Sequence, residues 1–211
     1  MGIDLKGALK TQDEIMADMF GDNNTGIREL AIADLKPYPN QPFRPYSENK
    51  LAELTEDIKM NGIISPVIVR KMKPDETSVY EYYQILAGHN RVRAGELAGL
   101  EKVPCIVKTD ISDEQAQLIM VNTNLNQRDE LLPSEKAFAY KMQMDAMKQQ
   151  GTRNDFVHNV HKVDNLQEMG VANNESRRNI SYYIRLTYLT SDLLQMVDEK
   201  ILPFRAGVAL S

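Results

Sequence analysis

One stretch of the sequence combines the residue types that bind an anion at the start of a helix. It reads Gln84-Ile85-Leu86-Ala87-Gly88-His89-Asn90-Arg91-Val92-Arg93-Ala94, a predicted strand that ends at a glycine and leads at once into a predicted helix. The free backbone N–H groups and the positive dipole end of a helix start attract phosphate. Arg91 and Arg93 diverge by about 200° on a regular helix, so a regular first turn does not let both grip one phosphate. A phosphate site and surface arginines in salt bridges both stay open as interpretations.

A second stretch is typical of a helix-turn-helix motif. Residues 164–171 predict a short helix that stops at Gly170, and a second helix begins near Asn174 with Ile180 and Ile184 facing inward. In this motif the N-terminal residues of the second helix meet base edges in the major groove. Those positions hold polar and bidentate side chains suited to bases and phosphates, namely Ser176, Arg177, Arg178, Asn179 and Ser181. The alternative is an ordinary pair of amphipathic helices with a solvated basic face.

The elements that position these residues follow from periodicity and helix breakers. A proline-rich segment over 37–45 predicts extended chain, and the cap Ser47 starts a helix that ends at Gly62. We expect strands over 63–70, 80–87 and 103–107, and helices over 89–97, from the capping box at Ser112, and from Pro133 to about Gln150. After the candidate linker at 151–155 only helical patterns follow. This order predicts an α/β domain followed by an all-α domain.

Composition restricts the class of protein. The net charge is −5, but residues 1–34 hold seven acidic and three basic residues, so the rest of the chain is nearly neutral and has room for a local basic face. Residues 1–27 form an acidic leader with apolar residues at helical spacing, either a helix packed on its own domain or a partner-docking arm. Cys105 is the only cysteine and lies in a predicted buried strand, which excludes an internal disulfide. His158 and His161 are interpreted as a surface pair. Without a membrane span or signal peptide, we expect a cytoplasmic protein.

Several segments in fixed order resemble one family. They are 35–42, 54–58, 62–70, 88–94 and 97–104, and together they look like the N-terminal domain of ParB/RepB/Noc-type partition proteins, while 164–210 resembles the central helix-turn-helix domain of that family. The resemblance implies an α/β ParB/sulfiredoxin-like domain at 28–150 and an all-α helix-turn-helix domain at 151–211. Members of the family bind CTP with Mg²⁺, load at a palindromic DNA site, and close into a clamp that slides on DNA.

The resemblance also implies roles for individual residues. The expected nucleotide-binding residues are Gln41, Arg44, Gly88, His89, Asn90, Arg91, Arg93, Ala94 and Arg128. The family segment usually reads Gly-Glu-Arg-Arg-x-Arg-Ala, so His89 and Asn90 replace a glutamate and an arginine. In the metal motif, the acidic position of the family falls on Asn122 or Asn124. An amide is a weaker Mg²⁺ ligand than a carboxylate and is not a general base, so we expect at most weak CTP hydrolysis.

The expected function is therefore sequence-specific DNA binding by a CTP-controlled homodimeric clamp in plasmid or chromosome partition. A ParA-type ATPase is a candidate partner of the leader. A transcription or nucleoid-occlusion regulator with the same domains is one alternative. A nuclease is another, although the sequence shows no cluster of metal-binding carboxylates or histidines. Sulfiredoxin shares the fold but needs a reactive cysteine in the phosphate segment, where this chain has His89 and Asn90. Family members usually continue beyond the position of Ser211 into a dimerisation domain.

Overall fold

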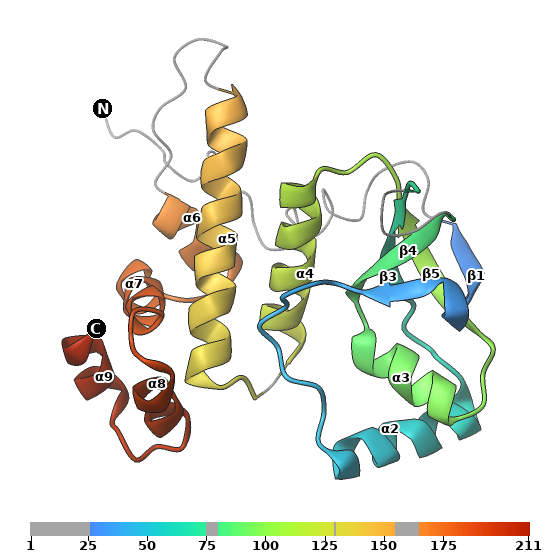
Figure 1. The fold of residues 1–211 in the computed structure, drawn as a ribbon, viewed down its shortest axis with the longest axis horizontal. Coiled ribbons are helices and arrows are strands. Elements are labelled where there is room, and N and C mark those ends of the chain that lie inside the picture. Colours follow the sequence, from blue (N-terminus) through green and yellow to red (C-terminus); the bar gives the residue numbers. More distant parts are fainter. Residues whose placement is uncertain (1–25, 75–79, 129, 155–164) are drawn as a thin grey trace, which may run out of the picture. The chain divides into compact units, whose positions relative to one another are not determined.

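The computed structural model describes residues 26–74, 80–128, 130–154 and 165–211 (Figure 1). The predicted leader helix and the histidine pair His158 and His161 lie outside these residues. The chain forms two compact units that divide after Met120, within helix α4 (Asp113–Gln127). We call the described residues from 26 to 120 the α/β unit and those from 121 to 211 the helical unit.

The α/β unit is built on a mixed five-stranded sheet in the order β1-β5-β3-β4-β2. Its strands are β1 (Ile27–Ala31), β2 (Leu35–Pro37), β3 (Val67–Met72), β4 (Tyr82–Ala87) and β5 (Lys102–Lys108). The pairs β1–β5 and β3–β4 are antiparallel, whereas β3–β5 and β2–β4 are parallel. The central strand β3 is the most deeply buried, with Val67 and Val69 fully inaccessible to solvent.

The connection between the two edge strands shows that the sheet is curled. β1 and β2 lie at opposite ends of the strand order, yet only the 3-10 turn η2 (Ile32–Asp34) joins them. Four residue steps span at most about 14 Å when extended, and less in a 3-10 turn. A flat sheet of this width would place its edge strands about 19 Å apart. The sheet therefore rolls toward a barrel, and its concave side holds a core of valines, Ile85 and Cys105.

Two helices pack together beside the sheet (Figure 1). α2 (Glu48–Asn61) begins at Ser47, whose hydroxyl accepts a hydrogen bond from the N–H of Lys50, and ends at Gly62 with φ of 70°. α3 (His89–Leu97) starts directly after β4. Leu51 and Ile58 of α2 pack on Ala94 of α3, which buries the apolar face of both helices. This packing fixes the first turn of α3 at the end of β4.

The helical unit consists of the end of α4 and five further helices. These are α5 (Pro133–Asn154), α6 (Asn165–Ala172), α7 (Arg177–Leu186), α8 (Ser191–Asp198) and α9 (Phe204–Leu210). The long helix α5 packs on α6, α7 and α8, so this helix belongs with the helical unit. Between 165 and 211 the structure contains helices and no strand, as the sequence predicts. The predicted domain boundary at residue 150 stays a prediction.

Several predicted elements are confirmed and others are wrong. The helix over 89–97, the helices at Ser47 and Pro133, and the capping box at Ser112 are as expected, with Ser112 and Gln115 exchanging backbone-to-side-chain bonds of 2.8 and 3.2 Å. The predicted strand over 63–70 begins only at Val67, because Pro66 has no N–H to donate to a ladder. The predicted linker at 151–155 is helical through Asn154, since one glycine costs a helix only about 1 kcal/mol. The edge strands β1 and β2 were not expected.

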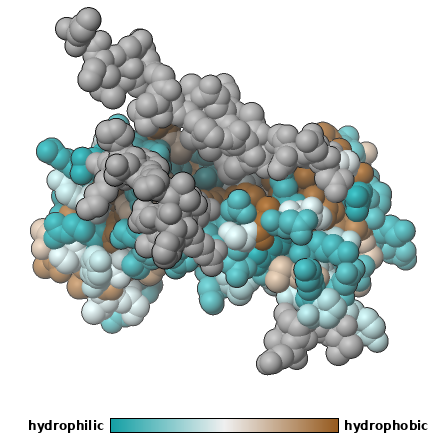
Figure 2. Space-filling view, turned by 90° about the horizontal axis from the view of Figure 1, so that it is seen from above, coloured by the Kyte–Doolittle hydropathy of each residue, from teal (hydrophilic) through white to brown (hydrophobic). Residues whose placement is uncertain are grey.

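The surface of the described residues is mixed in character. Figure 2 shows hydrophobic residues in small groups among hydrophilic ones on the face that it presents. The most exposed large apolar side chains are Ile64 and Tyr80, each 81% exposed, and Met60 at 76%. Within the described residues, no helix is both long and apolar enough to cross a membrane.

Candidate functional site

The backbone at the end of β4 adopts a conformation that suits a glycine. Gly88 has φ of 101°, which side chains disfavour, and a Cβ there would lie 3.3 Å from the Cζ, Nε and Nη2 atoms of Arg91. The guanidinium of Arg91 therefore lies over the backbone of Gly88. Because α3 begins at the next residue, this cation sits beside the backbone N–H groups of a helix start. The structure thus concentrates positive charge and backbone donors at one place.

Arg91 is held there by a neighbouring turn. Its Nη1 donates to the hydroxyl of Ser65 at 2.9 Å, to the carbonyl of Pro66 at 2.8 Å, and to the carbonyl of Ser65. Burial lowers the pKa of Arg91, while the nearby Tyr46 opposes that shift, and the guanidinium remains a cation at neutral pH. Its Nε and Nη2 make no hydrogen bond to the described residues. Two donor groups of a fixed cation are therefore available to a ligand.

His89 and Asn90 contact the loop of residues 38–46. The N–H of Tyr38 donates to Nε2 of His89 at 3.2 Å, and the N–H of Tyr46 donates to Oδ1 of Asn90 at 3.2 Å. The loop is thus joined to the first turn of α3 at both of its ends. Phe43 lies in the middle of the loop and is only 3% exposed, which anchors it on the unit.

The other predicted nucleotide-binding residues of the α/β unit differ in their surroundings. Gln41 lies in the same loop, and its Oε1 is buried without a hydrogen-bond donor among the described residues. Arg44 and Arg93 are exposed. Ala94 is fully buried against α2, so its side chain is a packing group. The structure therefore brings the loop of Gln41 and Arg44 and the turn of Ser65 to the same helix start.

The candidate metal residues belong to the helical unit. Asn122 is buried, and its Oδ1 accepts a hydrogen bond of 2.9 Å from Gln143, which in turn accepts one of 3.1 Å from Asn173. This chain of amides holds Asn122 in the packing of the helical unit, and Asn122 and Asn124 both stay candidate ligands. The N–H of Arg128 donates to the backbone carbonyl of Asn124 at 3.2 Å, which extends the last turn of α4. No three His, Cys, Asp or Glu side chains gather for a metal in the parts of the chain that the structure describes.

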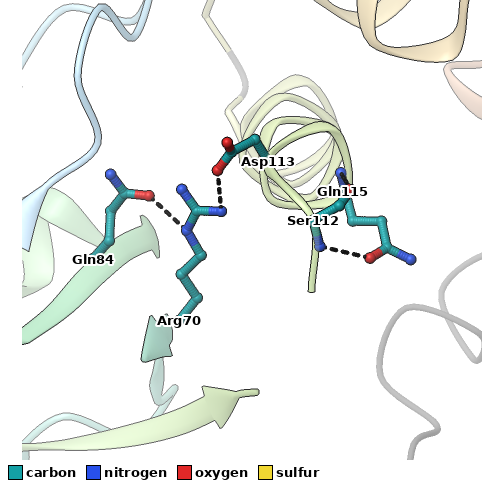
Figure 3. A network of polar contacts seen from close by, with 5 residues as sticks. All are labelled: Arg70, Gln84, Ser112, Asp113 and Gln115. Carbon is teal, nitrogen blue, oxygen red and sulfur yellow. Dashed lines mark hydrogen bonds and ion pairs between the residues drawn. The ribbon is translucent and has the colours of Figure 1, made fainter. Parts of the chain in front are cut away.

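A buried arginine that the sequence pattern did not indicate lies on β3 (Figure 3). Arg70 is 8% exposed, and its Nε donates to Gln84 of β4 at 2.9 Å while its Nη1 pairs with Asp113 at 2.7 Å. Asp113 is the first residue of α4, so the pair ties the sheet to the start of that helix. Burial raises the pKa of the nearby Tyr38, an effect that the charge of Arg70 reduces. From the sequence alone, an arginine in a strand is expected to face solvent. Its burial here is explained by Gln84 and Asp113, which the strand pattern does not reveal.

The helices α6 and α7 meet through a tight turn. Gly170 does not end α6, as the sequence suggested; the helix continues to Ala172 and the left-handed residue is Asn174, with φ of 51°. Gly170 is needed for another reason, since a Cβ there would lie 2.8 Å from the backbone oxygen of Glu175. The N–H of Glu175 donates to the carbonyl of Gly170 at 2.9 Å. The close approach fixes how the chain enters α7.

The predicted DNA-contacting residues surround the start of α7. The hydroxyl of Ser176 caps the helix by accepting a hydrogen bond of 3.1 Å from the N–H of Asn179, whose side chain donates to Glu175 at 2.7 Å. Arg177 and Arg178 occupy the first turn and are exposed, while Ser181 is half-buried. The structure therefore makes Ser176 the N-cap of α7, ties the side chain of Asn179 to Glu175, and places the two arginines at the surface.

Comparison with known sequences identifies the family. The model of the ParB N-terminal domain matches residues 17–125, more than half of the chain. The chain belongs to the ParB family. It is 34% identical over 185 residues to stage 0 sporulation protein J of Bacillus subtilis, covering 87% of this chain and 57% of that protein. It is 35% identical over 136 residues to a nucleoid occlusion protein of Listeria monocytogenes, covering 64% of this chain and 45% of the relative.

Among solved structures, the chain resembles a C-terminally truncated ParB from Caulobacter crescentus that was crystallised with the centromeric parS site. The TM-score is 0.51 with 23% identity, covering 87% of this chain and 97% of the other, so the likeness concerns the fold. The expected ParB-type α/β fold is confirmed. The chain spans about half the length of the curated ParB-family relatives that it matches.

Proposed function

We propose that this ParB-family chain binds CTP at the first turn of α3 and DNA at the start of α7, and acts as a nucleotide-controlled, homodimeric DNA clamp in partition. The observation that carries the nucleotide site is the guanidinium of Arg91 over Gly88, with two donor groups not engaged by the described residues. Arginine donors and helix-start N–H groups are the groups that phosphates require. Family membership supports a partition role.

The loop of residues 38–46 fits the base of the nucleotide. The Oε1 of Gln41 is buried without a donor among the described residues, and a buried acceptor is destabilising unless a donor reaches it. The exocyclic amino group of cytosine is such a donor. We place the phosphates at Gly88, Arg91 and Arg93 and the base toward Gln41 and Arg44. Since Ala94 is buried, only its backbone is offered to the ligand.

Mg²⁺ is proposed with the nucleotide, with Asn122 or Asn124 as its side-chain donor and Arg128 as a further nucleotide-binding residue, as the resemblance to the family implies. The carbonyl oxygen of an asparagine is an acceptable but weak donor for a hard cation, which suits a site that keeps several waters. When bound, the metal would neutralise phosphate charge. Asn122, whose oxygen accepts from Gln143, serves the packing of this region.

Calorimetric titration tests the nucleotide site. CTP, ATP and GTP are titrated with and without Mg²⁺ into the wild type, Arg91→Ala and the matched control Lys59→Ala. Lys59 is an exposed cation on α2 whose partner is Glu56, so its removal changes the net charge equally without touching the site. We expect CTP binding to be lost in Arg91→Ala and retained in Lys59→Ala. Equal CTP affinity in the two variants would refute the site.

Slow hydrolysis is part of the proposal. An amide in the metal motif does not accept a proton from water, and the Nε2 lone pair of His89 already accepts a hydrogen bond from the N–H of Tyr38. We therefore expect CTP binding without efficient turnover, and a clamp that opens by nucleotide release. A phosphate-release assay with CTP and cognate DNA decides this point, and rapid turnover that is lost in His89→Ala would show that His89 is the base.

DNA binding is proposed at the first turn of α7. Arg177→Ala and Arg178→Ala should each weaken binding to a selected palindromic site by about 1–3 kcal/mol if a base contact is lost. A lost phosphate contact would instead weaken all sequences alike and reduce the salt dependence. Arg185→Ala is the control, because Arg185 lies in the last turn of α7 and donates to the carbonyl of Ser211. Wild-type affinity in both Arg177→Ala and Arg178→Ala would refute the assignment of the recognition helix.

A nucleoid-occlusion or transcription regulator is the second candidate, because the Listeria relative carries the former name at 35% identity. The two functions differ in the DNA sites and partners that the same folds meet. Genome-wide mapping of the bound sites separates them, since partition predicts sites clustered near one locus.

A ParA-type ATPase is the proposed partner under the partition function. Co-purification with such an ATPase, lost when residues 1–27 are removed, would support that partner.

A further inference from the structure

We infer that His89 and Asn90 are positioning residues, which hold the loop of residues 38–46 in place for the nucleotide instead of gripping its phosphates. The inference rests on the proposed CTP site and concerns how that site is formed. Both side chains present a hydrogen-bond acceptor to a backbone N–H of the loop, at 3.2 Å in each case. The two contacts lie at the two ends of the loop, so together they fix its whole span.

The contacts give two backbone N–H groups of the loop an acceptor. Tyr38 and Tyr46 are half-buried, and a backbone N–H that is shielded from water needs an acceptor. Adjacent residues on a helix point about 100° apart, which lets His89 and Asn90 reach different ends of one loop. The segment Gly88–Ala94 therefore has two tasks in this proposal: Gly88 and Arg91 serve the anion, and the two residues between them, His89 and Asn90, hold the loop.

The residue types fit this division. Neutral imidazole nitrogen and amide oxygen are acceptors, whereas the arginine usual at the position of Asn90 in the family has donors only and does not accept from an N–H. Compared with the usual family segment, this chain has one cation fewer for the phosphates and one more hydrogen bond to the loop. Because Gln41 and Arg44 belong to this loop, the base side of the site is formed before the ligand binds. Preorganisation of this kind lowers the entropy that binding removes.

Amide hydrogen exchange, followed by NMR on the full chain without nucleotide, tests the contacts one at a time. His89→Ala should accelerate exchange of the N–H of Tyr38 and leave that of Tyr46 unchanged, and Asn90→Ala should do the reverse. His89→Gln and Asn90→Asp are the matched controls, since each keeps an acceptor at the same place, and each should retain protection. Phe43 remains as a buried anchor, so the loop stays in place and the fold is preserved.

The effect on the nucleotide is measured as the dissociation rate of CTP with Mg²⁺, by stopped-flow displacement. Loss of one loop contact should raise this rate about 2- to 12-fold, the range of one net hydrogen bond. His89→Gln should restore the wild-type rate. A residue that served only local packing would alter amide exchange without altering dissociation.

Two results would overturn the inference. One is unchanged exchange of Tyr38 and Tyr46 in the alanine variants, and the other is faster exchange with an unchanged rate of CTP dissociation. If the wild type binds none of CTP, ATP and GTP, the proposed function fails. In that case the amide exchange of Tyr38 and Tyr46 alone tests the loop contacts. Failure of the CTP site is thus distinguished from failure of the inference about His89 and Asn90.

Discussion

Gly170→Ala should destabilise the helical unit, although the same change stabilises most helices. In a helix interior, alanine is favoured over glycine by about 1 kcal/mol. At Gly170 the new Cβ would lie 2.8 Å from the backbone oxygen of Glu175, and that oxygen is not a side-chain end that rotates away. Overpacking of this kind costs about 1–3 kcal/mol. After the propensity gain is subtracted, we expect a net loss of up to about 2 kcal/mol.

Gly95→Ala is the matched control within α3. A Cβ at Gly95 would have Ile63 at 3.4 Å and Val103 at 3.5 Å as its nearest neighbours, which is ordinary contact with side chains. This variant should therefore be stabilised by about 0.4–1 kcal/mol. Both glycines are buried and helical. A gain in stability at Gly95 and a loss at Gly170 would therefore be due to the close approach of the turn at Gly170.

Thermal unfolding followed by circular dichroism measures both variants, together with binding of a selected DNA site. A loss of 1 kcal/mol lowers the melting temperature by about 4–8 °C in a unit of this size. Gly170→Ala should also weaken DNA binding, because the turn that it disturbs sets the direction of α7. If Gly170→Ala and Gly95→Ala are stabilised alike, the packing described for the turn between α6 and α7 is wrong.

Three further predictions concern buried polar groups. Arg70→Met should lower the free energy of unfolding by about 1–3 kcal/mol, because it removes the donor that binds the buried Gln84. Asp113→Ala should lower it by less than about 1 kcal/mol, because that carboxylate is 85% exposed. Equal losses in urea titrations would contradict this order. Burial raises the pKa of Cys105 to about 12, so a thiol reagent at pH 8 should modify only the unfolded chain. The stability that comes from the neutral thiol is full below pH 9 and should decline as the pH rises toward 12. Rapid labelling of the folded chain would contradict the burial of this thiol. The carboxylate of Asp198 accepts hydrogen bonds from the N–H and the hydroxyl of Ser134 at 2.9 and 2.6 Å. Asp198→Ala removes this cap at the start of α5 and should lower the free energy of unfolding by about 1–2 kcal/mol. An unchanged melting temperature would show that solvent replaces the cap.

Local signals in the sequence predicted the elements that local interactions form. Ser47 and Ser112 cap helices in the structure as predicted, because a cap involves only residues within one turn. The edge strands β1 and β2 were missed because five and three residues become strands only through pairing with β5 and β4, which lie far along the chain. Sequence periodicity contains no information on such distant partners.

The same limit applies to the candidate site. Gly88 and Arg91 were indicated by a strand-to-helix junction, which is a local pattern, and the structure places them in contact. The resemblance places His89 and Asn90 among the nucleotide-binding residues, and the structure adds that they accept hydrogen bonds from Tyr38 and Tyr46, more than 40 residues away. Gly170 was interpreted as a helix stop, whereas the structure uses it for the close approach of Glu175 in the turn that follows α6, which residue types alone do not reveal.

The curled sheet has a consequence for how other chains can associate with the α/β unit. An open sheet edge is a template on which a strand from another molecule can add, and it is a common start of aggregation. Here one edge is the three-residue strand β2, which contains Pro37 and so lacks one N–H donor, and the curl brings it near the other edge, β1. Neither edge offers a long flat row of donors and acceptors. A second copy of this unit is therefore expected to associate through helices and side chains and not by extending the sheet, which also protects the unit from strand-to-strand aggregation.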